Sequence, residues 1–461
     1  MADRPVNHYN NQYETVKFFG TDLLSRTGML LSGTVVVDAE TTIEDGAVVT
    51  EDARIVAVGE RSKLLERYPD HERRAFDIVA PGLVGGHVHS VQSLGRGIAD
   101  DTSLLSWLFD HVLPMESGMD AEAMRVAAEL GYLECIESGT TTVIDHLSVH
   151  HAEEAFEAAI ELGIRGRLGK VLMDKNSPDG LQEDTDEALG ETERLLERYH
   201  GSADGRIKYA VTPRFAVSCT EACLRGAREL ADRHDDVRIH THASENPEEV
   251  ETVREETGLR NVHWLDEVGI TGEDVVLAHC VHTDESEREL LAETGTHVTY
   301  CPSSNMKLAS GVAPIPDYLD RGINVALGND GPPCNNTLDP FTEMRQASLL
   351  QKVETLDPTA TPAGTVLEMA TLNGARAAGF ERVGALREGW KADVVGLSTD
   401  AARAMPVHDI RSHLVFAAHG DDVAFTMVDG KVLYDGGEHV GIEAERIRKR
   451  AREVAAEIGS R

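Results

Sequence analysis

The amino-acid sequence predicts an α/β fold: a parallel (β/α)8 barrel of the TIM type, joined to a small β-sandwich domain built from both chain ends. Eight short apolar runs alternate with amphipathic stretches of helical spacing in the middle of the chain. On either side lie segments in which apolar and polar residues alternate between glycine turns. Metal-binding or titratable residues follow nearly every apolar run. Eight strand–helix units suit a closed parallel barrel, and the alternating ends are typical of antiparallel sheet.

The two chain ends share one pattern. It occurs in "MLLSGTVVVD" and "IEDGAVVTEDARIVAVGE" within residues 29–60, and again in "ADVVGLS" and "VAFTMVDGKVLYDGGEH" near the C-terminus. Alternation of this kind indicates strands with one buried face. We therefore expect residues 1–80 to form the N-terminal part of the β-sandwich domain, with an extension over 1–27. Residues 81–384 would form the barrel, and residues 385–461 the C-terminal part of the sandwich and a terminal helix.

The eight predicted barrel strands are short and apolar. In chain order they are "GLVGGHVH", "TTTVIDHL", "RGRLGKVLM", "IKYAVTPRF", "VRIHTHASE", "DVVLAHCVH", "THVTYCPSS" and "INVALGND". Stretches such as "AEEAFEAAIELG" and "ESERELLAETG" separate them and carry helical periodicity. In such a barrel the active site lies at the carboxyl ends of the strands. Functional residues should therefore follow these runs.

The first run ends in "HVH", and residues i and i+2 of a strand point to the same face, so His87 and His89 can grip one metal ion. Polar groups also lie at the other strand ends. In chain order, the residues at the eight strand ends are His87 and His89; Asp145 and His146; Lys170; Arg214; His242 and Glu245; His279; Ser304 and Asn305; and Asp330. Their joint placement predicts a metal-dependent active site.

Four short motifs resemble the amidohydrolase superfamily in order and spacing: the H-x-H after "PG", the H-x-x-E of "HASE", "AHC" and "GND". "REGWKADVV" (387–395) resembles that superfamily's return into the small β-domain. Four longer segments resemble one branch, which holds methylthioadenosine/S-adenosylhomocysteine deaminases, 5′-deoxyadenosine deaminases and chlorotriazine hydrolases. They are "RGIADD" (96–101), "WLFDHVLPMES" (107–117), "SSNMKLASGVAPIP" (303–316) and "GNDGPPCNNTLDPFTEMRQASLLQK" (328–352).

The resemblance implies one Zn²⁺ per chain, or Fe²⁺ or another divalent metal in its place. Its ligands would be His87, His89, His242 and Asp330, and three neutral imidazoles with one carboxylate suit Zn²⁺. Many superfamily members bridge two metals with a strand-4 lysine. Here that strand ends "TPRF", and Lys208 lies at its start, so we expect a single metal.

The implied chemistry is hydrolytic deamination. Asp330 would take a proton from water, and Glu245 would protonate a ring nitrogen and pass a proton to the leaving amine. His279 would hydrogen-bond the attacking hydroxide or serve as a further ligand, and the sequence leaves both roles open.

The substrate is less tightly predicted than the reaction. Glu116 matches the position at which nucleoside deaminases of this branch hold ribose hydroxyls, while Trp107 would cover the base or sugar and Asn305 would read a purine edge. Arg214 and Gln92 instead resemble guanine deaminases, in which an Arg and a Gln contact the purine. We expect an adenosine-type nucleoside: 5′-deoxyadenosine, methylthioadenosine, S-adenosylhomocysteine or adenosine. The alternatives are a guanine deaminase, a chlorotriazine-type hydrolase and a non-catalytic barrel scaffold.

Composition restricts the partners. With 80 Asp and Glu against 44 Lys and Arg, the net charge is −36, so we expect an acidic surface that binds neither nucleic acid nor anionic membranes. No apolar stretch reaches the ~20 residues of a membrane helix, and the polar N-terminus lacks a signal-peptide core. The six cysteines form no C-x-x-C, and we expect them to be reduced and mostly buried. We therefore expect a soluble, cytoplasmic homo-oligomer that binds a small-molecule purine nucleoside or base.

Overall fold

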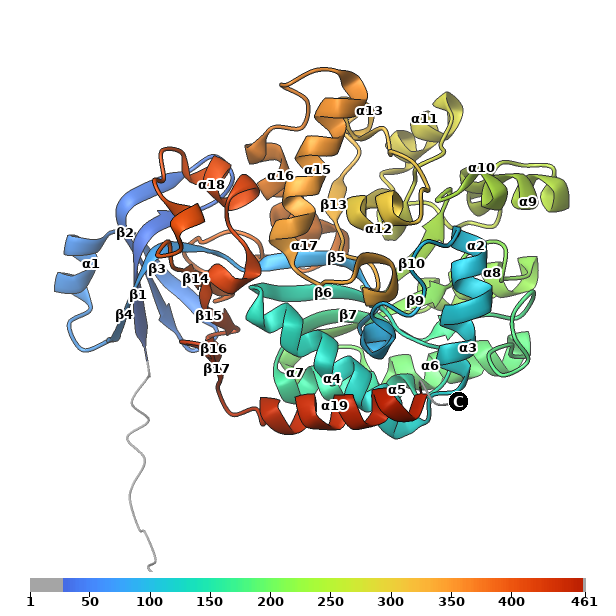
Figure 1. The fold of residues 1–461 in the computed structure, drawn as a ribbon, viewed down its shortest axis with the longest axis horizontal. Helices are drawn as coiled ribbons and strands as arrows, with labels where there is room; N and C mark the ends of the chain where they lie inside the picture. Colours follow the sequence, from blue (N-terminus) through green and yellow to red (C-terminus); the bar gives the residue numbers. More distant parts are fainter. Residues whose placement is uncertain (1–27, 459–461) are drawn as a thin grey trace, which may run out of the picture.

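The computed structural model describes residues 28–458, which form a parallel barrel and a second sheet built from both chain ends (Figure 1). The predicted fold class is confirmed. The predicted 1–27 extension lies outside the described residues. All six cysteines are buried and free of disulfides. Within residues 28–458, no helix combines the length and the apolar character needed to cross a membrane.

The barrel strands coincide with the eight predicted apolar runs, except that the third run is split in two. They are β5 Leu83–Val88, β6 Thr140–His146, β7 Arg165–Gly169, β8 Val171–Leu172, β9 Ile207–Pro213, β10 Arg238–Ala243, β11 Val275–His279, β12 His297–Tyr300 and β13 Val325–Leu327. The strands pair in parallel around the barrel from β5 to β13. The short strand β8 lies off this path and pairs only with β9, also in parallel. A parallel bridge from Val88 to Asp330 brings the last strand against the first and closes the ring.

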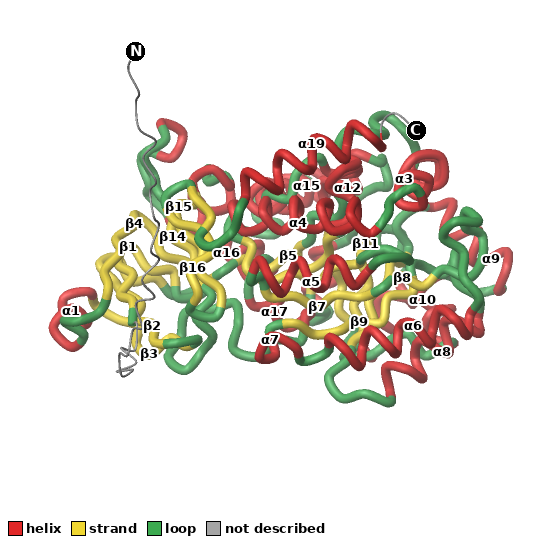
Figure 2. Tube along the Cα trace, turned by 90° about the horizontal axis from the view of Figure 1, so that it is seen from below, coloured by secondary structure: helices red, strands yellow, loops and turns green. Residues whose placement is uncertain are grey.

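Helices surround the barrel strands, as Figure 2 shows in another orientation. They are α2 Leu104–Ser106, α3 Leu113–Ser117, α4 Ala121–Glu137, α5 Ala152–Leu162, α6 Thr185–Tyr199, α7 Ser202–Gly205, α8 Glu221–Asp232, α9 Pro247–Thr257, α10 Asn261–Glu267, α11 Glu285–Thr294, α12 Pro302–Lys307, α13 Ile315–Asp320, α14 Pro332–Asn335, α15 Pro340–Thr355, α16 Ala363–Met369 and α17 Leu372–Ala378. Side-chain caps begin many of them; Asp284, for example, forms a full capping box with Glu287 at the start of α11.

The small domain is one continuous sheet of eight strands with the order β17-β16-β15-β14-β4-β1-β2-β3. The strands are β1 Met29–Val36, β2 Thr42–Glu51, β3 Arg54–Glu60, β4 Glu72–Pro81, β14 Val394–Leu397, β15 Val423–Val428, β16 Lys431–Asp435 and β17 Glu438–His439. The chain ends meet where β4 pairs with β14. Leu31, Val79, Val394 and Phe425 from both ends share one buried core. Helix α1 Arg61–Arg67 follows β3, and α18 Ile410–Phe416 lies between β14 and β15.

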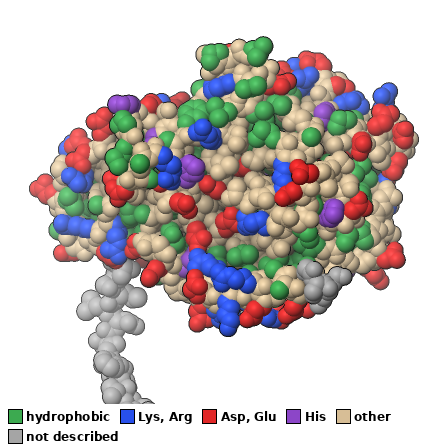
Figure 3. All heavy atoms as spheres, in the orientation of Figure 1, with side chains coloured by type: hydrophobic (Ala, Val, Ile, Leu, Met, Phe, Trp, Pro, Cys, Tyr) green, Lys and Arg blue, Asp and Glu red, His purple; other side chains and the backbone are tan. Residues whose placement is uncertain are grey.

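The C-terminal helix α19 Ala444–Ile458 crosses back to the barrel and packs on α4. Figure 3 shows Lys and Arg side chains gathered at the lower edge of the molecule, where Figure 1 places α19. Arg450 Nη2 lies 2.6 Å from Glu122 Oε1 at the start of α4, and Arg448 pairs with Glu137 at its end. Ion pairs at both ends of α4 therefore fix this helix against the barrel.

A buried ion pair joins the barrel to the small sheet. Arg165, at the start of β7, donates two hydrogen bonds of 2.8 and 3.0 Å to Asp393, just before β14. Its Nη2 also lies 2.7 Å from Asp429 Oδ1, and both Arg165 and Asp393 are almost fully buried. Removal of the arginine would leave the Asp393 carboxylate buried without this cation.

Arg165→Ala should lower the free energy of unfolding by about 3–5 kcal/mol, because breaking a buried pair leaves an uncompensated charge. Chemical denaturation monitored by circular dichroism measures this loss. The matched control is Arg194→Ala, which removes a half-exposed arginine paired with Glu191 and should cost only about 0–1 kcal/mol. Equal losses in the two variants would contradict the structural role given to Arg165.

Candidate active site

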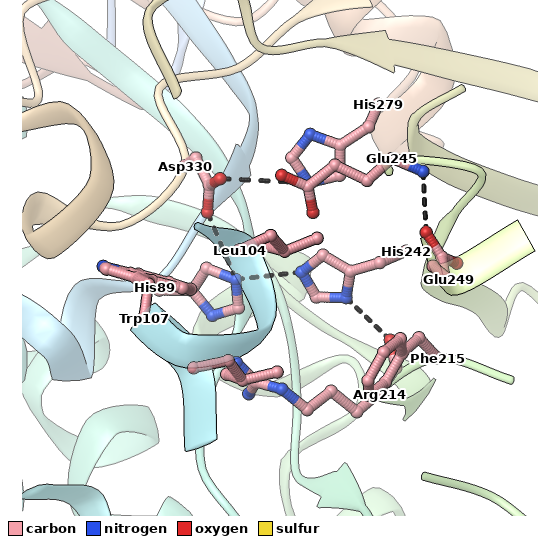
Figure 4. A pocket seen from close by; sticks show the side chains of 11 residues that line it. His89, Leu104, Trp107, Arg214, Phe215, His242, Glu245, Glu249, His279 and Asp330 are labelled. Carbon is pink, nitrogen blue, oxygen red and sulfur yellow. Dashed lines mark hydrogen bonds and ion pairs between the residues drawn. The ribbon is translucent and has the colours of Figure 1, made fainter. Parts of the chain in front are cut away.

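The carboxyl ends of three barrel strands bring the predicted metal ligands together. Figure 4 shows three of them, His89, His242 and Asp330. His87 and His89 come from the end of β5, His242 from β10, and Asp330 follows β13. The Nε2 atoms of His89 and His242 lie 3.1 Å apart, and Asp330 Oδ1 lies 3.4 Å from Nε2 of both His87 and His89. All four side chains are buried. These nitrogens and the carboxylate oxygen therefore converge on one point.

The outer nitrogens of two imidazoles have fixed roles. His89 Nδ1 lies 2.7 Å from the carbonyl oxygen of His146, and His242 Nδ1 lies 2.6 Å from that of Arg214. A carbonyl only accepts, so each Nδ1 carries the proton and each Nε2 presents a lone pair to the centre. Burial and then the neighbouring His87 lower the pKa of both rings well below the usual value, which keeps them neutral.

His87 is oriented by a histidine that sequence reasoning missed. His240 Nδ1 donates to the carbonyl oxygen of Val276 (3.0 Å), so its Nε2 accepts the Nδ1–H of His87 (2.7 Å). His87 Nε2 therefore carries no proton and has a free lone pair. The atom is buried and has no hydrogen-bond partner among the described residues. His240 stands two residues before His242, so the same-face argument used for His87 and His89 could have found it.

The donor set suits a divalent metal ion. Three buried imidazoles turn unprotonated nitrogens toward one carboxylate, and their outer N–H groups are held by hydrogen bonds, an arrangement typical of metal-binding histidines. His87, His89 and His242 offer nitrogen atoms that all lie within 4.8 Å of one another. The residues present therefore fit the metal that the sequence predicts.

His279 has a different kind of hydrogen-bond partner from the other three histidines. The amide Nδ2 of Asn305 lies 3.0 Å from its Nδ1, so Nδ1 accepts and the ring proton is on Nε2. That Nε2 faces Glu245 Oε2 at 3.5 Å and Asp330 Oδ2 at 3.8 Å. Burial lowers the pKa of His279 to about 4, so the ring is neutral at physiological pH. The atoms that His87, His279 and Asp330 offer also lie within 4.8 Å of one another, so both roles that the sequence leaves open for His279 fit this geometry.

Glu245 has the properties of an acid. Its carboxyl group is buried, and burial raises its pKa well above the usual value, with the charges of Asp330 and Glu249 adding to the shift. Ser310 Oγ donates to Oε1 at 3.3 Å. A buried carboxyl group whose pKa is raised binds its proton more tightly, and such a group can act as a general acid toward a substrate.

A pocket lies beside this cluster. One wall is polar, and the other is apolar and comes mainly from α2 and the π-helical turn Trp107–Val112. The lining residues are His89, Leu104, Trp107, Leu108, Arg214, Phe215, His242, Glu245, Glu249, His279 and Asp330. The cavity therefore presents the acid and the ligand cluster to a flat, largely apolar group.

The predicted substrate residues fall into three places. Trp107 and Arg214 line the cavity, and each has a buried N–H without a partner among the described residues. Asn305 lies on the outer side of His279. Gln92 and Glu116 are not on the cavity wall: Gln92 Nε2 donates to Glu116 Oε1 at 2.7 Å, and a serine hydroxyl, Ser148 Oγ, donates to Oε2 at 2.9 Å.

The family can now be stated. Residues 78–433 match the family model described as "Amidohydrolase family", and residues 46–70 match an imidazolonepropionase-like composite domain. The chain belongs to the amidohydrolase family. It is a hydrolytic enzyme, and the resemblance seen in the sequence is confirmed.

Three relatives show how far the likeness extends. A 5′-deoxyadenosine deaminase of Methanopyrus kandleri is 36% identical over 94% of this chain and 99% of its own length. A 5-methylthioadenosine/S-adenosylhomocysteine deaminase of Haloarcula marismortui is 40% identical over 94% of this chain and 99% of its own length. A zinc-bound crystal structure of an adenosine deaminase from Xanthomonas campestris superposes with a TM-score of 0.89, at 31% identity, over 94% and 99% of the two chains.

In this amidohydrolase two lysines on or beside the barrel strands, Lys208 and Lys170, both pair with carboxylates. Lys208, at the amino end of β9, bonds to the carbonyl oxygen of Gly379 at 2.7 Å and pairs with Asp236 at 2.5 Å. Lys170, where β7 gives way to β8, pairs with Glu183. No lysine is among the described residues that line the cavity. The expectation of one metal per chain stays a prediction that this placement supports.

Replacement of His240 by Phe should weaken metal binding by about 10–100-fold, because His87 loses the group that fixes its ring and tautomer. Competition titration with a chromogenic chelator measures the affinity directly. His297→Phe is the control, since His297 is also buried but lies at the start of β12, at the amino end of the barrel. An unchanged affinity in His240→Phe would show that His87 does not need this partner.

Proposed function

We propose that this amidohydrolase is a zinc-dependent hydrolytic deaminase of an adenosine-type nucleoside. The substrate would be 5′-deoxyadenosine, methylthioadenosine, S-adenosylhomocysteine or adenosine, and the products its inosine analogue and ammonia. The observation that carries the proposal is the buried acid Glu245, which lies in one cavity with the neutral ring of His279 and the carboxylate of Asp330. The names of the two curated relatives support the nucleoside class.

His87, His89, His242 and Asp330 would hold the metal ion, with Zn²⁺ as the expected ion and Fe²⁺ or another divalent metal as the alternative. The zinc-bound neighbour supports Zn²⁺. When bound, the ion supplies a Lewis acid that makes water acidic enough to attack carbon at neutral pH.

The chain's own residues move the protons. Asp330 takes one proton from the attacking water while His279 Nε2–H donates a hydrogen bond to the water oxygen. Glu245 gives its proton to the purine N1 as oxygen adds to C6. The new C6 hydroxyl then loses the second water proton to Glu245, which passes it to the amino nitrogen, and the proton held by Asp330 returns to Glu245. The C6–N bond then breaks, leaving a carbonyl at C6 and releasing ammonia. Ser304 Oγ (2.6 Å) and the Gly331 N–H (2.7 Å) hold the Asp330 carboxylate in place.

The cavity wall suits a purine. Trp107, Leu108 and Phe215 offer a flat apolar surface, and the unpaired N–H groups of Trp107 and Arg214 can meet ring or sugar acceptors. Arg214 on the cavity wall keeps guanine deamination as the second candidate.

The ribose would be bound by Glu116. An ionised carboxylate accepts several hydrogen bonds, so Glu116 can take the sugar diol once Gln92 releases its Oε1. The Ser148 hydroxyl would continue to hold Oε2. Because neither residue lines the cavity, the proposal requires the Gln92–Glu116 contact to open toward the cavity when the nucleoside binds.

Glu245→Gln should keep the metal and lose most of its turnover. The amide is nearly isosteric with the carboxyl group but cannot shuttle protons, so we expect kcat to fall by about 10²–10⁴-fold. Ammonia release is measured alongside metal content. A metal-replete Glu245→Gln protein with near wild-type turnover would refute the proposed acid.

Glu116→Ala separates the two candidate substrates. Losing a charged partner worth about 1.5–3 kcal/mol should lower kcat/KM for nucleosides by roughly 10–100-fold, while a free base should be unaffected. The measurement is ammonia release from adenosine, 5′-deoxyadenosine, methylthioadenosine, S-adenosylhomocysteine and guanine. Arg214→Ala is the reciprocal variant. Efficient guanine turnover with no activity on 5′-modified adenosines would overturn the nucleoside proposal.

A further inference from the structure

A second glutamate, Glu249, stands directly behind the acid Glu245. Its Oε2 accepts the backbone N–H of Glu245 at 2.7 Å, a contact drawn in Figure 4, and its Oε1 accepts the N–H of Ser244 at 3.2 Å. The side chain of Asn261 also donates to Oε1, so both oxygens are occupied. This carboxylate therefore binds the two consecutive amides at which β10 ends and from which the acid projects.

The backbone at Ser244 is held by hydrogen bonds from residues outside its own strand. Ser244 has φ 51°, in the left-handed region that side chains other than glycine rarely adopt. Its carbonyl oxygen accepts the N–H groups of Val281 (3.0 Å) and His282 (2.8 Å), from the loop that follows β11. The carbonyl is thus tied to one neighbouring loop and the N–H to Glu249. Together these bonds set the direction in which the next residue, Glu245, leaves the strand.

The contacts of Glu249 go beyond ordinary helix capping. Asn246 caps α9 by accepting the N–H of Glu248, and a glutamate at the position of Glu249 normally reaches back to the backbone of the cap residue itself. Glu249 makes that contact, since a hydrogen bond from the backbone of Asn246 helps to lower its pKa, but it also bonds to Glu245 and Ser244, one and two residues further back. The last two bonds lie on the strand end that carries the acid, so helix stability alone does not account for them.

Glu249 is also costly to bury. Its side chain is 1% exposed, and none of the ion pairs of the described residues includes it. Burial raises its pKa to about 7, although its hydrogen bonds lower it. A raised carboxyl pKa means that its ionised form is less favourable in the folded protein than in the unfolded chain. Groups kept at such a cost concentrate at functional sites.

We propose that Glu249 is the positioning residue of the general acid: its buried carboxylate fixes the Ser244–Glu245 backbone so that the Glu245 side chain faces the substrate and His279. The inference rests on the proposed role of Glu245 and adds a residue that acts only through it. Ser310 completes the arrangement from the other side, where its hydroxyl reaches Glu245 Oε1. Glu249 thus fixes the position of the Ser244–Glu245 backbone, and Ser310 fixes the position of one carboxyl oxygen of Glu245.

The test compares Glu249→Gln with Glu248→Gln, the neighbouring exposed glutamate of the same helix. Glutamine offers one acceptor oxygen where Glu249 uses two, so one of the two backbone amides loses its partner. We expect kcat of Glu249→Gln to fall by roughly 10–100-fold, since small misplacements of a reacting group cost up to about 10². KM and metal content should stay near wild type, and Glu248→Gln should behave as wild type.

A double-mutant cycle decides whether Glu249 acts through Glu245. In the Glu245→Gln background, adding Glu249→Gln should lower kcat by less than about twofold further, because the acid it positions is already gone. Full additivity, an unchanged kcat in the single variant, or a loss of metal in step with activity would overturn the proposal. Glu249→Asp, which keeps the charge but shortens the reach, serves if the glutamine variant does not fold.

Hydrogen exchange makes the inference independent of the substrate. In Glu249→Gln at least one of the amides of Ser244 and Glu245 should exchange about tenfold faster, whereas those of β11 should not change. If the enzyme turns over no adenosine-type nucleoside, the kinetic measurements use guanine or a chlorotriazine, whichever it hydrolyses. Unaltered exchange at both amides would overturn the positioning role, whatever the substrate proves to be.

Discussion

The contact on which the site depends is the closure of the barrel. The backbone N–H of Asp330 donates to the carbonyl oxygen of His87 at 2.9 Å, where the end of the last strand meets β5, and Val88 forms the parallel bridge to Asp330. This bond seats the carboxylate of the cluster beside the H-x-H pair, although the two segments lie at opposite ends of the barrel sequence. If the ring did not close, the candidate ligands would remain on two distant segments, and neither half could present a complete site.

Neutral imidazoles are the second constraint, because a buried cluster of histidines is tolerated only if the rings carry no charge. Burial lowers the pKa of His89, His240 and His242 well below the usual value, and each outer Nδ1–H has a backbone carbonyl to bond to. The carbonyl groups come from neighbouring parallel strands and the loops that follow them. The sheet itself therefore selects the tautomer that leaves Nε2 free, and the metal-binding character of the cluster follows from strand pairing.

The fold and the gathering of the cluster could be predicted from the sequence, whereas the partners of individual side chains could not. Apolar runs locate strands, and a residue just after a run must lie at the carboxyl edge of the barrel, so His242 and Asp330 could be placed together. Which group a side chain bonds to depends on the rotamer and on strand stagger, which spacing does not encode. Gln92 and Glu116 therefore bond to each other rather than lining the cavity, and the contact of Glu249 with the strand end could not be predicted.

The two ends of the barrel use buried charge differently. At the amino end, Arg165 meets Asp393 and Asp429, so opposite charges are paired and the barrel is joined to the small sheet. At the carboxyl end, Glu245 and Glu249 are buried among backbone amides and hydroxyl groups, and burial raises the pKa of both. Paired charges hold the two parts of the molecule together, whereas burial without a paired cation makes the Glu245 carboxyl group bind its proton more tightly, as acid catalysis requires, and leaves the Glu249 carboxylate to bind backbone amides. The division follows the general rule that barrel enzymes place stability at one face and chemistry at the other.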